Sequence, residues 1–305
     1  MIKTAMRTVG TASLCLALAT GAVLPALADS AETGRMTGGK KVERIVFASD
    51  RISGQGANNP EGDLEIFTMS PEGKKLRQLT RNAVDDFDPA FSPDGKISFV
   101  SQNVQPSNPE GDSEVYLMNP DGSDPRNLTN STGAVSDQDP RFSADGQEIA
   151  FTSFGKQPSN AEGDFEIYVM NVDRSGQRNV TNTAGGISDF DAALSPDGQT
   201  VAYVSAGVQP SNPEGDDEIF AINADGSGRR NLTDTASGVQ DDFPDFAPDG
   251  MRIAYDSDGI QPSNPEGDAE VYVMNALDGT DQRNLTRTGG DVLDVQPDLE
   301  AAVSE

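Results

Sequence analysis

Histidine and tryptophan are absent from the 305 residues, and Cys15 is the only cysteine. Without histidine the chain cannot build a Ser-His-Asp or Cys-His nucleophile pair, or a histidine-ligated zinc or iron site. With one cysteine it cannot form an internal disulfide. Basic residues are also scarce, because 22 Lys and Arg stand against 50 Asp and Glu, giving a formal net charge of −28. Such an excess repels phosphate backbones and anionic membrane surfaces, so we expect no nucleic-acid partner and favour cations or a basic protein.

The amino-terminal segment has the pattern of an export signal. A short basic start precedes an apolar stretch from Val9 to Leu24, and Ala26-Leu27-Ala28 matches a signal-peptidase site. The apolar stretch contains polar residues and glycine and is short for a membrane span. We therefore predict a cleaved signal peptide over residues 1–28, a flexible linker over residues 29–42, and export to the periplasm or the extracellular space without membrane insertion.

The remainder of the chain is a tandem repeat. Three markers recur in fixed order, with spacings of 49 to 52 residues between copies of the first. In one copy the markers are Asn108-Pro109-Glu110-Gly111-Asp112, Arg126-Asn127-Leu128-Thr129 and Phe142-Ser143-Ala144-Asp145-Gly146. Chance similarity does not produce several markers in one register, so the chain is built from one structural unit of about 52 residues.

Each unit is expected to form four short antiparallel strands. Apolar residues alternate with others in Ile97 to Ser101, and β-branched and aromatic residues fill Glu114 to Met118. Arg-Asn-Leu-Thr and the residues leading into the Phe marker supply the other two strands, while Ser-Pro-Asp-Gly and Asn-x-Asp-Gly are turn sequences. Four strands repeated at this period predict an all-β fold, a β-propeller.

The same motifs resemble a known family. Phe-Ser-Pro-Asp-Gly-Lys, Ile-x-Phe-x-Ser, Glu-Ile-Tyr-x-Met-Asn-x-Asp-Gly and Arg-Asn-Leu-Thr resemble the WD-like repeat of TolB propellers over residues 43–299. The resemblance implies a propeller fold. TolB propellers have six blades and an N-terminal α/β domain, and we expect neither in this chain from its length and sequence. The resemblance therefore does not imply that the chain docks in the Tol-Pal envelope machinery.

The two ends of the repeat region predict the number of blades. The first unit lacks the innermost strand, whereas Asp294 to Leu299 matches Asp137 to Phe142 and has no unit after it. We expect this last segment to complete the first blade, which gives five four-stranded blades with a three-plus-one closure over residues 43–299 and a tail at 300–305. Six blades is the alternative count.

Acidic residues recur at fixed places in the two long loops of each unit, which emerge on one face of the propeller. Long loops on a rigid scaffold commonly carry binding residues. One column, expected at the channel mouth, is Asp86, Asp137, Asp189, Asp241 and Asp294. A second pair of columns forms the predicted binding face and consists of Glu61, Asp63, Glu110, Asp112, Glu162, Asp164, Glu214, Asp216, Glu266 and Asp268. A further column is Glu65, Glu114, Glu166, Glu218 and Glu270.

Several interpretations of these acids stay open. Oxygen ligands of this kind suit Ca²⁺, with Asp63, Asp112, Asp164, Asp216 and Asp268 as candidates, although no D-x-D-x-D-G loop is present. Repeated Asp residues also serve blade architecture. The leading prediction is a monomeric, non-enzymatic binding module that offers the acidic face to a basic protein of the cell envelope or extracellular space. The alternatives are a carboxylate-based glycosidase and a calcium-stabilised structural propeller.

Overall fold

Runs rich in β-branched and aromatic residues form the strands of the blades. Alternate side chains point to opposite faces of a sheet, and in the second, third and fourth blades both faces of the second strand are buried. The computed structural model describes residues 44–54 and 56–287. The first sheet contains β1 (Ile45–Ser49), β4 (Glu65–Met69) and β5 (Arg77–Gln78), with a small hairpin of β2 (Ser53–Gly54) and β3 (Ala57–Asn58) in its long loop. The other four sheets have four strands each. The second blade is β6 (Asp86–Phe91), β7 (Ile97–Ser101), β8 (Glu114–Met118) and β9 (Arg126–Asn127). The third is β10 (Ser136–Phe142), β11 (Glu148–Phe154), β12 (Phe165–Asn171) and β13 (Arg178–Asn179), and the fourth is β14 (Ser188–Leu194), β15 (Thr200–Ala206), β16 (Glu218–Asn223) and β17 (Arg230–Asn231). The fifth is β18 (Gln240–Phe246), β19 (Arg252–Asp258), β20 (Glu270–Asn275) and β21 (Arg283–Asn284).

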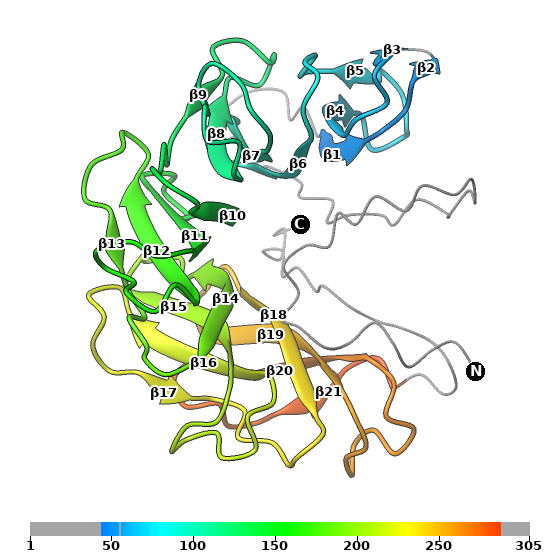
Figure 1. The fold of residues 1–305 in the computed structure, drawn as a ribbon. Helices are drawn as coiled ribbons and strands as arrows, with labels where there is room; N and C mark the ends of the chain where they lie inside the picture. The colour runs from blue at the N-terminus through cyan, green and yellow to red at the C-terminus, as the bar shows by residue number, and fades with distance from the viewer. Residues whose placement is uncertain (1–43, 55, 288–305) are drawn as a thin grey trace, which may run out of the picture.

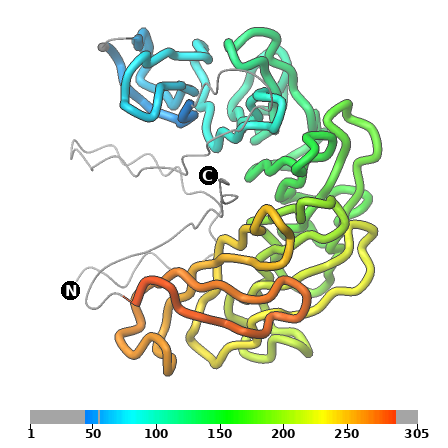
Figure 2. The backbone as a smooth tube through the Cα atoms, turned by 180° about the vertical axis from the view of Figure 1, so that it is seen from behind, coloured from blue at the N-terminus to red at the C-terminus, as the bar shows by residue number. Residues whose placement is uncertain are grey.

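The sheets follow one another around an arc, with β6, β10, β14 and β18 on its inner side (Figures 1 and 2). This arrangement confirms the predicted all-β propeller of five antiparallel sheets. The closing strand predicted at 294–299 lies outside the described residues, as do Asp294, the signal peptide, the linker up to residue 42 and the tail. Residues 44–54 and 56–287 include no helix long and apolar enough to cross a membrane.

The core lies between consecutive blades. In each blade an aromatic residue of the second strand faces one of the third strand, as in Phe99 and Tyr116, whose ring centroids are 5.5 Å apart. One apolar cluster joins Val46 and Ile66 of the first blade to Ile97 of the second. Burial of each such side chain contributes about 1.5–3 kcal/mol, so packing between blades stabilises the fold.

Arginines of the Arg-Asn-Leu-Thr marker tie each blade to the next. The Arg77 guanidinium donates to the Asp121 carbonyl oxygen at 2.8 Å, and Arg178 donates to the Ala224 carbonyl oxygen at 2.9 Å. These bonds cross from an outermost strand to the tight turn of the following blade. Together with the core they give the loops at the opposite end a rigid base.

The inner strands share a β-bulge that turns one residue out of the regular ladder. Pairing of β14 with β15 shifts between Phe190 and Ala193, and Asp191 adopts a positive φ of 50°. The same shift occurs in β6, β10 and β18, with φ of 47° at Asp88, 52° at Asp139 and 52° at Phe243. Bulges often re-aim side chains next to functional sites, so the inner side of the arc is a candidate location for such a site.

Candidate functional site

Each blade joins the next through two buried carboxyl groups. Glu114 of β8 and Asp137 of β10 are 1% and 0% exposed. Thr129 donates to Glu114 and accepts the Val115 N–H at 3.1 Å, while Ser131 donates to Asp137 at 2.6 Å. We call this arrangement the inter-blade acid pair.

The pair recurs at the other described junctions. Thr235, for example, donates to Glu218 at 3.0 Å and to Asp241 at 3.3 Å and so links both members directly. In the first blade Asn82 takes the bridging role, with bonds of 2.9 and 2.8 Å to Glu65 and Asp86. The four inter-blade acid pairs are Glu65 with Asp86, Glu114 with Asp137, Glu166 with Asp189, and Glu218 with Asp241.

Burial raises the pKa of these carboxyl groups. Desolvation takes the pKa of Asp86 to about 7, that of Asp137 to about 6 and that of Asp241 to about 8. The pKa of Glu114 rises to about 8 for the same reason, with Asp137 adding repulsion. In each pair one member, Asp86, Glu114, Glu166 or Asp241, has a pKa of about 7 or 8, so each pair keeps about one proton at pH 6.

The structure therefore corrects two expectations. The Asp86, Asp137, Asp189 and Asp241 column was expected to ring the channel mouth, and the Glu column beginning at Glu65 was counted in the acidic surface. Both columns are buried at the blade junctions, where they are used by hydrogen bonds within the fold. Their repetition reflects architecture, because every junction needs the same bonds.

The Asn-Pro-Glu-Gly-Asp loop is rigid because it is folded around its asparagine. The Asn108 amide donates to the Asp112 carbonyl oxygen at 2.6 Å and accepts the Gly111 N–H at 3.0 Å. Main-chain bonds of 3.0 and 2.9 Å join Gln105 to Asn108. Asn108 is 1% exposed, whereas Glu110 at the tip is exposed. The loop thus fixes its backbone and leaves the glutamate to solvent.

The glycine of this loop is required by its conformation. Gly111 has a φ of +79°, and a Cβ there would lie 2.8 Å from Val104 Cγ2 and 3.1 Å from the Val104 nitrogen. Gly163, Gly215 and Gly267 show the same close approach to Lys156, Val208 and Ile260.

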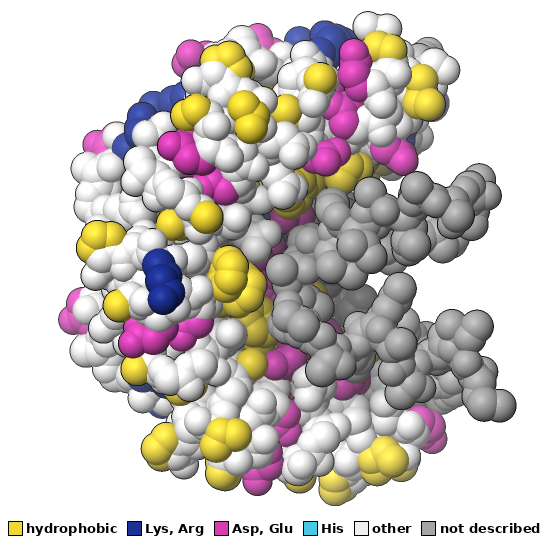
Figure 3. All heavy atoms as spheres, in the orientation of Figure 1, with side chains coloured by type: hydrophobic (Ala, Val, Ile, Leu, Met, Phe, Trp, Pro, Cys, Tyr) yellow, Lys and Arg dark blue, Asp and Glu magenta, His cyan; other side chains and the backbone are white. Residues whose placement is uncertain are grey.

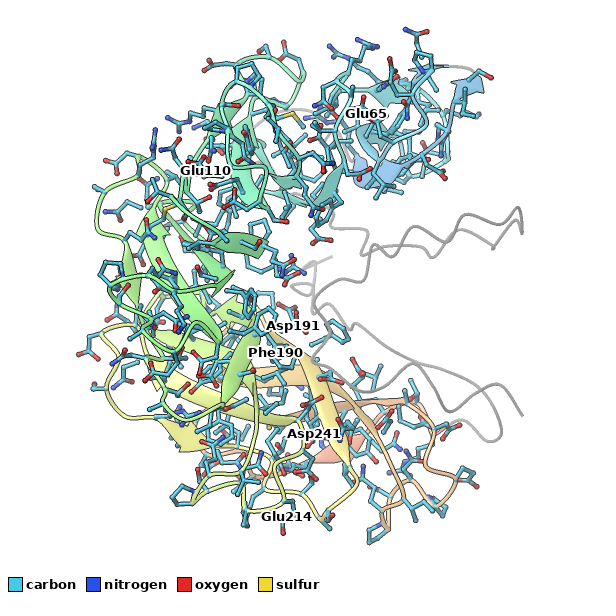
Figure 4. All side chains as sticks on the ribbon, viewed as in Figure 1. Glu65, Glu110, Phe190, Asp191, Glu214 and Asp241 are labelled. Atoms are coloured by element: carbon cyan, nitrogen blue, oxygen red, sulfur yellow. The ribbon has the colours of Figure 1, made fainter. Side chains whose placement is uncertain are left out.

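The predicted binding-face residues divide into two groups in the structure. The Glu61, Glu110, Glu162, Glu214 and Glu266 column is exposed in every blade. The Asp63, Asp112, Asp164, Asp216 and Asp268 column is partly buried, and Asp112 accepts the Val135 N–H of the next loop at 3.2 Å. Figure 4 shows Glu110 and Glu214 toward the outer side of the arc.

The Asp63 column carries the calcium prediction. Both carboxylate oxygens of Asp63, Asp164 and Asp268 are buried without a hydrogen-bond partner among the described residues. Within those same residues no three carboxylate or cysteine side chains lie where they could hold one metal ion. Any cation at Asp63 would therefore need carbonyl oxygens or water as its other ligands, and calcium stays a prediction.

A second group of acids surrounds Asp191 on the inner side of the arc (Figure 4). Burial raises the pKa of Asp191 well above its usual value, and the carboxylates of Asp139, Asp242 and Asp88 raise it further, whereas Arg141 opposes them. Asp191 Oδ2 is buried and has no hydrogen-bond partner in the part of the chain that is described. Sequence reasoning missed these bulge residues, although Asp88, Asp139 and Asp191 each stand two positions after a marker Asp.

The fifth blade breaks the repeat. Asp242 pairs in register with Asp256, where the second and fourth blades carry Val100 and Val204. Burial raises the pKa of Asp242, and Asp217, Asp256 and Asp258 add repulsion. The inner side of the arc is thus more acidic toward its β18 end than repetition alone would make it.

Comparisons with known proteins identify the repeat. Residues 104–258, half of the chain, match the family described as the TolB beta propeller domain. The chain is 29% identical over 164 residues to the protein TolB homolog of Chlorobium luteolum, which covers 53% of this chain and 33% of that protein. It is 37% identical over 102 residues to dipeptidyl-peptidase 5 of Porphyromonas endodontalis, which covers 33% of this chain and 13% of the peptidase. The chain therefore spans a third or less of the length of these relatives.

Solved structures show the same fold. The crystal structure of TolB from Acinetobacter baumannii aligns with a TM-score of 0.57 at 21% identity, covering 82% of this chain and 54% of that one. An oligogalacturonate lyase from Vibrio parahaemolyticus aligns with a TM-score of 0.52 at 14% identity, covering 83% of this chain and 71% of that one. One fold thus occurs in a TolB protein and in an enzyme, and the similarity extends to the fold alone.

Proposed function

Because the chain belongs to the TolB β-propeller domain family, we propose that it is an exported, non-enzymatic binding module whose long-loop face takes a protein with a basic surface. The long-loop face comprises the loops between the second and third strands and carries the Glu61 column. Export to the periplasm or the extracellular space is part of the proposal and rests on the amino-terminal signal pattern.

The observation that carries the proposal is the contrast between the acid columns. The Glu65 and Asp86 columns are buried and hydrogen-bonded inside the fold, whereas the Glu61 column is exposed on loops held in one conformation. A rigid loop loses little conformational entropy on binding. Repeated glutamates at its tips attract a basic partner and orient it during encounter.

Figure 3 shows acidic and apolar side chains interspersed on the face that it presents, with few basic ones among them. A mixture of this kind suits a protein interface better than a uniformly charged surface does, since interfaces combine apolar contacts with polar ones.

Capture of a partner by crosslinking from an envelope extract tests the proposal. The test variant replaces Glu61, Glu110, Glu162, Glu214 and Glu266 with Gln. The matched control replaces five exposed acids of the opposite tight turns, Glu72 with Gln and Asp94, Asp145, Asp197 and Asp249 with Asn. We expect a protein that the native chain and the control capture and the test variant does not. Equal capture by all three would refute a role for the long-loop face.

A second candidate function is supported by Asp191. A buried carboxyl group with a raised pKa beside other carboxylates is the arrangement of a general acid in glycoside hydrolysis. Sugar release from polysaccharides that disappears in Asp191→Asn would replace the binding module with a carbohydrate-active enzyme.

A further inference from the structure

The last residue pair before the long loop of the third blade, β10 to β13, is aromatic. Phe154 ends β11 and pairs with Phe165 at the start of β12. Their ring centroids are 4.6 Å apart with an interplanar angle of 27°, which makes a stacked pair. Unlike the aromatic pairs of the blade cores, this pair reaches solvent, because Phe154 is 43% exposed.

The blade fold does not require aromatic residues at this position. The corresponding pairs in the second, fourth and fifth blades are Gln102 and Ser113, Ala206 and Asp217, and Asp258 and Ala269. Polar, small and acidic residues therefore occupy the two ends of the same loop in these blades. An exposed aromatic stack at one of these positions is free to serve a contact outside the chain.

The loop above this pair also departs from the repeat. Lys156 occupies the position that is aliphatic and exposed in the other blades, where Val104 is 70%, Val208 75% and Ile260 78% exposed. The loops of the second and fourth blades thus place an exposed valine on either side of the third blade, on the face that carries the Glu column. Apolar surface on a face that carries a repeated exposed glutamate is complementary to a segment that carries both apolar and basic side chains.

We propose that the Phe154–Phe165 stack is the apolar anchor of the long-loop face and packs against an aromatic side chain next to Lys or Arg in the partner protein. This inference rests on the proposed function and adds the position and chemistry of its main contact. Aromatic anchors supply much of the energy of protein interfaces, while the surrounding charges set orientation. The exposed Glu162 of the same loop would face the basic residues of the partner. An acidic glycan is disfavoured because the same carboxylates would repel it.

Binding of three labelled ten-residue peptides, measured by fluorescence anisotropy, tests the proposal. The peptides alternate lysine with phenylalanine, lysine with alanine, and glutamate with phenylalanine. We expect the native chain to bind the lysine–phenylalanine peptide at least ten-fold more tightly than the other two. Phe154→Ala should reduce this preference to less than three-fold, since a few buried aromatic contacts carry most of the binding energy of an interface. Met251→Ala, which removes an exposed apolar side chain from a tight turn on the opposite face, should leave binding unchanged.

The outcomes separate the anchor from the proposed function. If Phe154→Ala binds like the native chain while the five-fold Glu→Gln variant does not bind, the anchor is refuted and the acidic face stands. If the native chain binds neither lysine peptide, the aromatic anchor and the acidic face are both refuted as a site for a basic partner. If maltohexaose or cellohexaose binds the native chain, is lost in Phe154→Ala and no peptide binds, the stack is a sugar platform and the proposal is overturned. Thermal melts of Phe154→Ala should lie within a few degrees of the native chain, which confirms that it is folded.

Discussion

Raising the pH from 6 to 8 should destabilise this propeller through its inter-blade acid pairs. In the unfolded chain these carboxyl groups ionise near pH 4, whereas in the folded chain their pKa values reach about 6 for Asp137, about 7 for Asp86 and about 8 for Asp241. The folded state therefore holds more protons than the unfolded state across this range. Stability is greatest below the unfolded pKa, falls as pH rises, and loses this contribution once the pH passes the folded pKa values.

The size of the effect follows from the number of retained protons. One retained proton lowers the free energy of unfolding by about 1.4 kcal/mol per pH unit. Each of the four inter-blade acid pairs holds about one proton at pH 6. By pH 8 the pairs of Asp86 and Glu166, with pKa values of about 7, lose theirs, and those of Glu114 and Asp241, with pKa values of about 8, keep roughly half. The average slope is then about 3–4 kcal/mol per pH unit. With roughly 2–4 °C of Tm per kcal/mol for a domain of this size, Tm should fall by roughly 10 °C or more between pH 6 and pH 8.

Differential scanning calorimetry in matched buffers at 0.5 M NaCl measures this fall while surface repulsion is screened. Glu114→Gln removes the member of the Glu114–Asp137 pair with the higher pKa, about 8, and should make the fall about a quarter smaller. Glu110→Gln, an exposed acid of the long loop, should leave it unchanged. A native Tm that is constant or rises from pH 6 to 8 would show that the pairs hold no extra protons.

Three further perturbations have defined outcomes. Arg229→Met removes the guanidinium 3.3 Å from the buried Asp189, whose pKa burial raises to about 6. We expect a loss of about 2–4 kcal/mol at pH 8, where Asp189 is ionised, and a smaller loss at pH 5, where it is mostly protonated. Equal losses in urea titrations at both pH values would contradict this. Asp191→Asn removes a carboxylate repelled by Asp139 and Asp242 and should raise Tm by a few degrees at pH 8, and a lower Tm would show that the charge is needed for folding. If the partly buried Asp63 column holds calcium, chelation with EGTA should lower Tm by 5 °C or more, and Ca²⁺ should restore it. An unchanged melt would refute the calcium prediction.

Much of the fold could be predicted because turns and strands carry local signals. The alternation in Ile97 to Ser101 and the turn sequence after Phe91 led directly to β7 and to the hairpin that precedes it. The strand predicted over Glu114 to Met118 is β8, and its Tyr116 is buried in the blade core.

The candidate site was predicted less well because burial of a carboxyl group has no local signal. Glu110 and Glu114 stand four residues apart, yet one is exposed at a loop tip and the other is buried against Thr129. That difference depends on Thr129, which follows β9 of the same blade, and on Asp137 of the next blade. The environment of Asp191 likewise depends on bulges in three different sheets. Repetition of an acid in the sequence therefore did not distinguish architecture from a binding surface.

Site-directed photocrosslinking tests the central claim, that the long-loop face is the binding surface, most directly. Benzoylphenylalanine is placed at Val104 or Val208 on the long-loop face and at Met251 or Leu277 in the tight turns, all of which are at least 70% exposed. The account predicts that one cellular protein is crosslinked from both loop positions and from neither turn position. Crosslinking from the turn positions, or equally from both faces, would contradict it.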